Sequence, residues 1–76
     1  MILYPGRYKM APIEAVAVRL KALRERKGWT QELLAQKAGS GRSHLARLET
    51  ARQDPTLSTL EKLARALGVK VSRLVE

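Results

Sequence analysis

The chain has 76 residues and no cysteine, and its 15 Lys and Arg against 7 Asp and Glu give a formal net charge of +8. This length allows one compact domain, and the lack of cysteine excludes disulfides and thiolate metal sites. No apolar run approaches the roughly 20 residues of a membrane span, and the first residues lack the order of a secretory signal. We therefore expect a cytoplasmic protein with no membrane contact. The excess of cations favours a polyanionic partner.

The N-terminal part of the chain predicts an arm followed by a helix. Residues 1–11 show no helical periodicity, so we expect an extended N-terminal arm before a single domain over residues 12–76. Pro12 suits the first turn of a helix. Over residues 13–27 the apolar side chains recur at three- and four-residue steps, and Gly28 can end a helix after its cationic last turn. The first helix is expected over this range.

Two short helices are expected next. Thr30 is a good N-cap for a helix over residues 31–38, because its side-chain oxygen can accept from an unpaired backbone N–H. Gly39 is placed to end that helix in a left-handed conformation, which a Cβ would penalise. After a very short connection, the apolar spacing predicts a third helix over about residues 42–50.

The C-terminal part predicts two further helices. Residues 51–55 are polar and end in proline, which indicates a loop. Thr56 can cap a fourth helix with leucines on one face, and Gly68 can end it. Residues 69–75 could form a short fifth helix that closes the core. Since no strand pattern or repeat competes with this interpretation, the expected fold is all-α.

Residues 31–48 satisfy the spatial demands of a helix-turn-helix unit, in which a second helix packs closely across the first through a tight turn. Ala35 supplies the small residue that close approach needs, and Gly39 supplies tolerance of a positive φ in the turn. Leu45 and Leu48 lie about one turn apart and can anchor the second helix. These restrictions are met together at the required spacing.

From residue 18 to residue 75 the chain resembles the Cro and phage-repressor type of helix-turn-helix proteins, also called XRE-like. The resemblance is carried by L-R-E-R-K-G-W-T-Q-E-L-L-A-Q-K-A-G, by L-A-R-L-E, and by D-P-T-L-S-T-L-E-K-L-A-R-A-L-G-V. It implies a compact five-helix repressor-type domain whose second and third helices form the DNA-reading unit. It also implies no cofactor, and homodimers that bind half-sites about 34 Å apart on double-stranded DNA.

The resemblance also implies a set of DNA-contacting residues: Thr30, Gln31, Arg42, Ser43, His44, Arg47 and Arg52. The spacing of Arg42, Ser43 and Arg47 allows all three to face a DNA groove while the leucines face the core. An arginine can bond O6 and N7 of one guanine together, so we expect a guanine in the bound sequence. The alternative for the arginines is a solvated basic face, and for His44 an ordinary exposed side chain.

Two further implications concern the frame of the site. Arg24 and Glu49 match positions where relatives form an ion pair between the first helix and the recognition helix. Thr50 and Ala51 stand where relatives usually have Asn-Gly, which suits a left-handed helix exit better. Gly41 replaces a common serine at the start of the third helix, so that helix depends on Ser40 for a cap or has none.

Other residues admit two interpretations each. Trp29 could stack on a ligand, but its place at a helix junction favours the core. The dimer surface is expected at the C-terminal helix, with Val71, Leu74 and Val75 as candidates, or at the arm. The arm could instead enter a minor groove.

The sequence contains one histidine and neither a nucleophile-plus-base set nor a Gly-rich phosphate loop, so we expect neither an enzyme nor a metal site. The leading hypothesis is a sequence-specific regulator of transcription, a dimeric repressor that reads the major groove with the helix over residues 42–50. One alternative is the antitoxin of a toxin–antitoxin pair, which would repress its own operon and bind a toxin. Another is a protein-interaction module that retains the fold.

Overall fold

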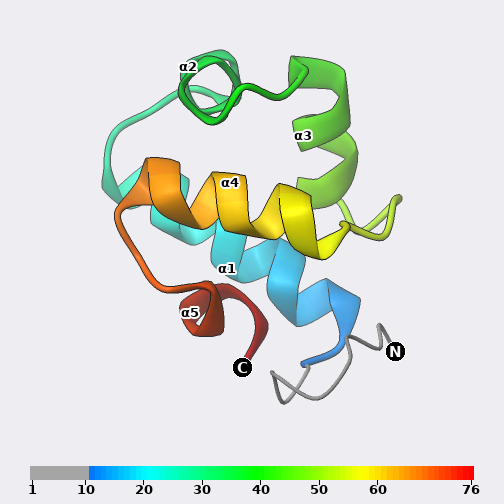
Figure 1. Cartoon of the computed structure of the whole chain (residues 1–76). Coiled ribbons are helices and arrows are strands. Elements are labelled where there is room, and N and C mark those ends of the chain that lie inside the picture. Colours follow the sequence, from blue (N-terminus) through cyan, green and yellow to red (C-terminus); the bar gives the residue numbers. More distant parts are fainter. Residues whose placement is uncertain (1–10) are drawn as a thin grey trace.

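Five helices account for most of residues 11–76, the part of the chain that the computed structural model describes (Figure 1). Their bounds are α1 Ile13–Arg26, α2 Gln31–Ala38, α3 Arg42–Glu49, α4 Leu57–Leu67 and α5 Val71–Val75. The described residues contain no strand, which confirms the expected all-α fold. The expected helices 13–27 and 42–50 each extended one residue too far, and the expected 69–75 began two residues early. The expected arm lies outside the described residues except for residue 11.

Four of the helices end in the same hydrogen-bonded turn. At the end of α2, the N–H of Gly39 donates to the carbonyl oxygen of Gln36 at 3.3 Å and the N–H of Ser40 to that of Ala35 at 2.9 Å. This pair of bonds requires a left-handed residue, and the φ of Gly39 is +69°. Glycine holds the equivalent position after α1 and α4. After α3 the position belongs to Ala51, whose φ is +58°.

The helix N-termini differ in how their backbone N–H groups are satisfied. The Thr30 hydroxyl oxygen accepts from the N–H of Leu33 at 3.0 Å, and that of Thr56 accepts from the N–H of Thr59 at 3.1 Å. These two N-caps confirm the expectation for α2 and α4. The N-cap of α3 is Gly41, and no side chain of the described residues caps this helix. Ser40 therefore does not take over the missing cap.

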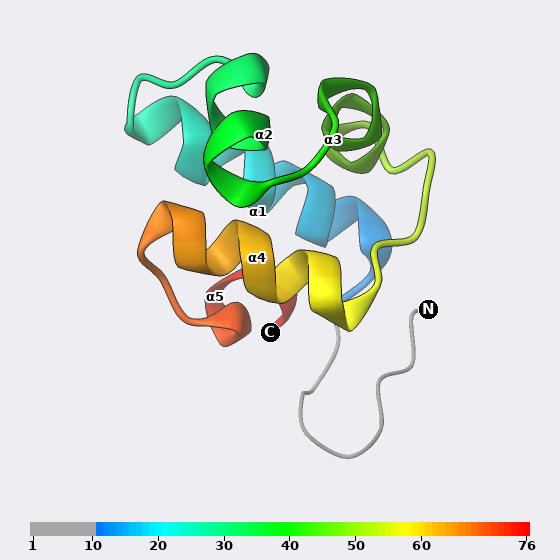
Figure 2. The same cartoon turned by 45° about the horizontal axis from the view of Figure 1, so that its top comes forward.

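Aliphatic side chains from all five helices form one core. The most deeply buried large side chains are Leu20, Leu34, Leu45, Leu60, Leu63, Leu67, Leu74 and Val75. Each fully buried leucine contributes roughly 1.5–3 kcal/mol relative to an exposed one. Helix α4 packs against α2 and α5, while α1 packs against α3 and α5 (Figure 2). The core thus holds α2 and α3 against a base made of the other helices.

Helix α5 closes this core, as expected, but the expected dimer surface at Leu74 and Val75 is wrong. The relative exposures of Leu74 and Val75 are both 0%, so these side chains cannot form a dimer surface. The short helix turns them inward because they complete the apolar base under α1 and α4. Val71 is half-buried and stays accessible.

The end of α5 also fixes the start of the domain. The N–H of Ala11 donates to the carbonyl oxygen of Val75 at 2.6 Å, and Ala11 packs against the core. Residue 11 is therefore part of the folded domain and not of the arm to which the sequence assigned it. Within residues 11–76, no helix combines the length and apolarity that crossing a bilayer requires.

Candidate nucleic-acid interface

Helix α3 lies at the edge of the molecule, joined to α2 by the three-residue connection 39–41 (Figure 1). Its inner side is anchored by Leu45 and Leu48, whose exposures are 0% and 3%. Arg42, Ser43 and Arg47 are exposed. At 100° per residue these three positions fall within an arc of about 140° around the helix axis. The structure therefore brings the expected reading residues onto one accessible face, with His44 half-buried beside them.

The start of α3 is suited to an anion. Because no side chain caps the helix at Gly41, its first backbone N–H groups remain available to an acceptor outside the domain. Such N–H groups and the positive end of the helix dipole attract phosphate. Arg42 is exposed in this first turn and adds a full positive charge.

The far end of α3 positions Arg47. Its Nε donates to Oε1 of Gln53 at 3.0 Å, which limits the rotamers of the side chain and leaves its terminal nitrogens able to donate elsewhere. The backbone N–H of Arg52 donates to the carbonyl oxygen of Arg47 at 2.9 Å, and the Arg52 side chain is exposed. Sequence reasoning missed Gln53, because it lies in an irregular loop where no periodic pattern points to a partner.

A buried ion pair ties α3 to α1. Nε of Arg24 lies 2.7 Å from Oε2 of Glu49, and Nη2 lies 3.0 Å from Oε1. Both residues are 8% exposed. The third nitrogen, Nη1, donates to the carbonyl oxygen of Trp29 at 2.6 Å. The guanidinium is thus held at three points, and the hydrogen bond to Glu49 raises the pKa of Arg24.

The same carboxylate holds the start of α2. Nε2 of Gln31 donates to Oε1 of Glu49 at 3.0 Å, and the side chain is half-buried. The amide nitrogen of Gln31 is therefore bonded inside the protein, while its amide oxygen can still accept a hydrogen bond from a ligand. Thr30 is exposed, and its hydroxyl can still donate outward while its oxygen caps α2. The structure brings the start of α2 and the end of α3 together through Glu49.

Trp29 is half-buried and packs against the core, so the sequence interpretation of a core residue holds for only part of the ring. The Nζ atoms of Lys27 and Lys37 lie 5.2 and 5.0 Å from the ring centroid. These are cation–π contacts. The ring thus joins the α1–α2 connection to α2. Among residues 11–76, no group of His, Asp and Glu side chains could hold a metal ion.

Comparison with known proteins adds to this geometry. Residues 20–74 match the model of a family described as helix-turn-helix, HTH_3. Over 60 residues the chain is 50% identical to the immunity repressor protein of Bacillus phage phi105. The aligned segment covers 79% of this chain but only 42% of the repressor. The restriction-modification controller protein C.AhdI from Aeromonas hydrophila has a similar structure, with a TM-score of 0.80 at 34% identity, over 82% of this chain and 94% of that one.

The structure is also similar to that of SinR, the master regulator for biofilm formation, solved in complex with DNA. The TM-score is 0.71 at 37% identity, over 74% of this chain and 90% of that chain.

Proposed function

The chain belongs to the HTH_3 helix-turn-helix family, and from that premise we propose that it is a sequence-specific regulator of transcription that binds double-stranded DNA as a dimeric repressor. The observation that carries the proposal is the exposed face of α3 with Arg42, Ser43 and Arg47, on a helix fixed by a buried ion pair. Similarity to a phage repressor and to a regulator solved with DNA supports it. The proposal places the protein in the cytoplasm with its DNA.

Helix α3 is the element that enters the major groove in this proposal, because that groove admits an α-helix and displays a distinct donor and acceptor pattern for each base pair. Arg47 is the principal base reader, since its bond to Gln53 orders the guanidinium in advance. A bidentate contact from arginine to guanine provides about 1–3 kcal/mol of discrimination. Arg42 and Ser43 read or flank the neighbouring base pairs.

Phosphate contacts position α3 in the groove. Thr30 and Gln31 at the start of α2, and Arg52 after α3, lie on either side of the recognition helix and offer hydroxyl, amide and guanidinium groups. His44 is a further candidate. Such contacts carry much of the affinity and make it salt-dependent, with a slope of about −0.9 in log K against log salt for each phosphate neutralised.

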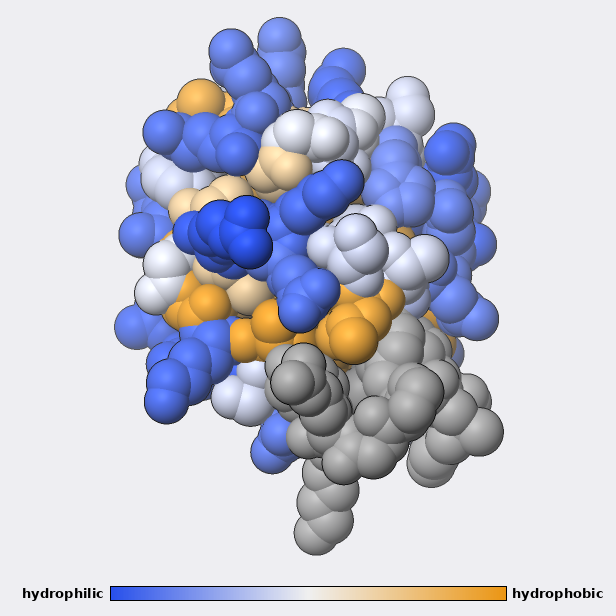
Figure 3. Space-filling view, viewed as in Figure 1, coloured by the Kyte–Doolittle hydropathy of each residue, from blue (hydrophilic) through white to orange (hydrophobic). Residues whose placement is uncertain are grey.

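The homodimer is part of the proposal because one recognition helix reads only a few base pairs. Figure 3 shows an apolar strip on the face below α4. The half-buried apolar residues of α4, α5 and their connection are Leu57, Ala66, Val69 and Val71. We assign the dimer contact to Val69 and Val71, which are close in sequence and half-buried, in place of the buried Leu74 and Val75.

The test is selection of bound duplexes from a random library across a salt series, with wild type, Arg47→Ala and the control Lys62→Ala on the exposed side of α4. We expect a palindromic motif containing guanine, loss of selectivity in Arg47→Ala, and an unchanged motif in the control. Arg52→Ala should weaken binding to all sequences alike and lower the salt slope. Weak binding with no enriched motif would overturn the proposal and favour a protein-interaction module.

A further inference from the structure

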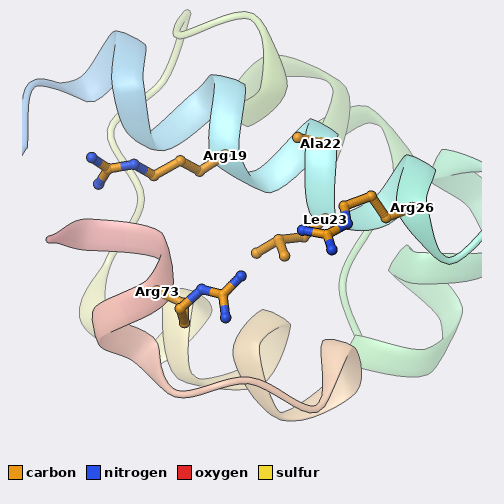
Figure 4. A pocket seen from close by; sticks show the side chains of 5 residues that line it. All are labelled: Arg19, Ala22, Leu23, Arg26 and Arg73. Carbon is orange, nitrogen blue, oxygen red and sulfur yellow. The ribbon is translucent and has the colours of Figure 1, made fainter.

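Three arginines surround a depression between α1 and α5. The depression has a volume of about 250 Å³ and is lined by Arg19, Ala22, Leu23, Arg26 and Arg73. Figure 4 shows the guanidinium groups of Arg26 and Arg73 turned toward the side chain of Leu23, with Arg19 further along α1. Leu23 is half-buried and packs against the core, so it forms an apolar floor between cationic walls.

A second depression continues the first. Its volume is about 270 Å³, and it shares Leu23, Arg26 and Arg73 with the first while adding Lys27 and Val69. We call the two together the α1–α5 groove. Leu23 lines both parts and gives each an apolar side chain.

Within residues 11–76, the cations of the groove form no ion pair. No acidic residue lines either depression. Among residues 11–76 the salt bridge that forms is that of Arg24 with Glu49, and none involves Arg19, Arg26 or Arg73. Nη1 of Arg19 donates to the carbonyl oxygen of Leu74 at 3.4 Å, which holds this side chain against α5. Like charges around a partly apolar depression repel one another, and a bound anion would relieve that repulsion.

The groove lies away from the proposed DNA-reading face. Arg24, which points to α3, is five residues after Arg19 and therefore about 140° around the axis of α1. Helices α5 and α3 lie at opposite ends of the molecule in both views of the fold (Figures 1 and 2). A ligand in the groove can consequently bind while α3 is occupied.

We propose that the α1–α5 groove binds an acidic segment of a partner protein, with carboxylates on Arg26 and Arg73 and an apolar side chain on Leu23, which lines both depressions. Arginine pairs carboxylates in a bidentate geometry, and the apolar floor selects a peptide over a purely polar anion such as phosphate. The protein's own first ten residues do not fit, because they contain two cations and no acid. This inference is independent of the proposed DNA binding.

The test uses a display library of random dodecapeptides, selected on the full chain in the presence of a saturating DNA duplex of the selected motif, or on the free chain if no motif is found. Arg26→Glu/Arg73→Glu is the groove variant, and Lys21→Glu, exposed on the same helix, is the matched control. Arg26→Gln/Arg73→Gln is a second, neutral variant in case charge reversal disturbs folding, which a thermal melt would report.

We expect enriched peptides with acidic residues flanking an apolar one. A synthetic peptide of that sequence should bind the groove variant at least tenfold more weakly and the control within twofold of wild type. Its amide shift changes in NMR should centre on residues 19–27 and 67–73. The proposal is overturned if no motif is enriched, if the peptide binds the groove variant equally well, if a polyglutamate of equal length or inorganic phosphate competes equally, or if the shifts centre on α3. The DNA motif selected by the groove variant should stay unchanged, because neither arginine lies on α3, and this separates the result from a failure of the proposed function.

Discussion

Arg24 and Glu49 place two opposite charges inside a domain whose whole stability is on the order of 4–11 kcal/mol by the usual per-residue range. The pair is tolerable there because each guanidinium nitrogen of Arg24 and each carboxylate oxygen of Glu49 has a hydrogen-bond partner. Among the described residues, no buried side-chain nitrogen or oxygen lacks a hydrogen bond. Removing one partner leaves an unpaired charge in a largely buried site.

Glu49→Ala is therefore expected to lower the free energy of unfolding by about 3–5 kcal/mol, because it strands the buried guanidinium of Arg24. Urea denaturation followed by circular dichroism measures this change. Glu61→Ala, which removes an exposed carboxylate from α4, should change stability by less than about 0.5 kcal/mol. A loss below about 1 kcal/mol for Glu49→Ala would contradict the stabilising role of the pair.

The pH dependence of this pair follows from the pKa of Arg24, which the hydrogen bond to Glu49 raises above its ordinary, already alkaline value. A group with a raised folded-state pKa contributes stability that is fully present below its unfolded pKa and is lost only as pH rises through the folded pKa. The stability difference between wild type and Glu49→Gln should thus be the same at pH 7 and pH 9, within about 0.5 kcal/mol. Parallel urea titrations at both values test this, and a marked fall by pH 9 would show that the arginine loses its proton.

Ala51 holds a left-handed conformation that costs a residue with a Cβ about 1–2 kcal/mol. Ala51→Gly removes that cost, and the greater freedom of glycine in the unfolded chain offsets about 0.4–1 kcal/mol of the gain. We expect a net stabilisation of roughly 0.5–1 kcal/mol, measured as a rise in the urea midpoint. The control Ala46→Gly lies inside α3 and should destabilise by about 1 kcal/mol. Destabilisation by both variants would refute the strain at Ala51.

At the scale of the helices, side-chain caps distinguish α2 and α4 from α3. Thr56→Ala deletes the acceptor for the N–H of Thr59 and should cost about 1 kcal/mol. For a domain of this size that corresponds to a fall of roughly 4–8 °C in Tm. Calorimetry tests the value against Ser58→Ala, an exposed neighbour that should leave Tm unchanged. Equal effects of the two substitutions would exclude the cap.

Much of the element order could be predicted from local chemistry. Thr30 and Thr56 mark helix starts and Gly28, Gly39 and Gly68 mark helix ends because caps act through bonds to residues close in sequence. The left-handed exit at Ala51 was harder to predict, since alanine does not favour this conformation, which accompanies the backbone bonds from Ala51 and Arg52 to carbonyl oxygens of α3.

Contacts between distant segments were beyond the sequence pattern. The resemblance implied the Arg24–Glu49 pair, but the additional bond from Gln31 to Glu49 and the bond from Arg47 to Gln53 depend on how helices and loops meet. The sequence predicted that the fifth helix closes the core but not which of its apolar residues face inward, because a five-residue helix is too short for its apolar spacing to distinguish an inner face from an outer one.

At the scale of the whole molecule, the half-buried apolar residues Val69 and Val71 predict the oligomeric state. Val71→Glu places a charge in the proposed contact and should weaken the dimer at least tenfold, measured by light scattering over a concentration series. Val18→Glu makes the same change on α1 at a residue that is 67% exposed, and it should leave the dimer intact. The proposed contact is wrong if the wild type is monomeric even on its DNA. It is also wrong if both variants weaken the dimer equally.

The hydrogen bond of 2.6 Å between Ala11 and Val75 brings the two ends of the folded domain to one point. A linker of a few residues would be enough to join them, and new ends could then be opened in the loop over residues 51–55. Domains with adjacent ends commonly tolerate such circular permutation. The five helices are therefore expected to pack in the same way when the chain begins and ends at a different loop.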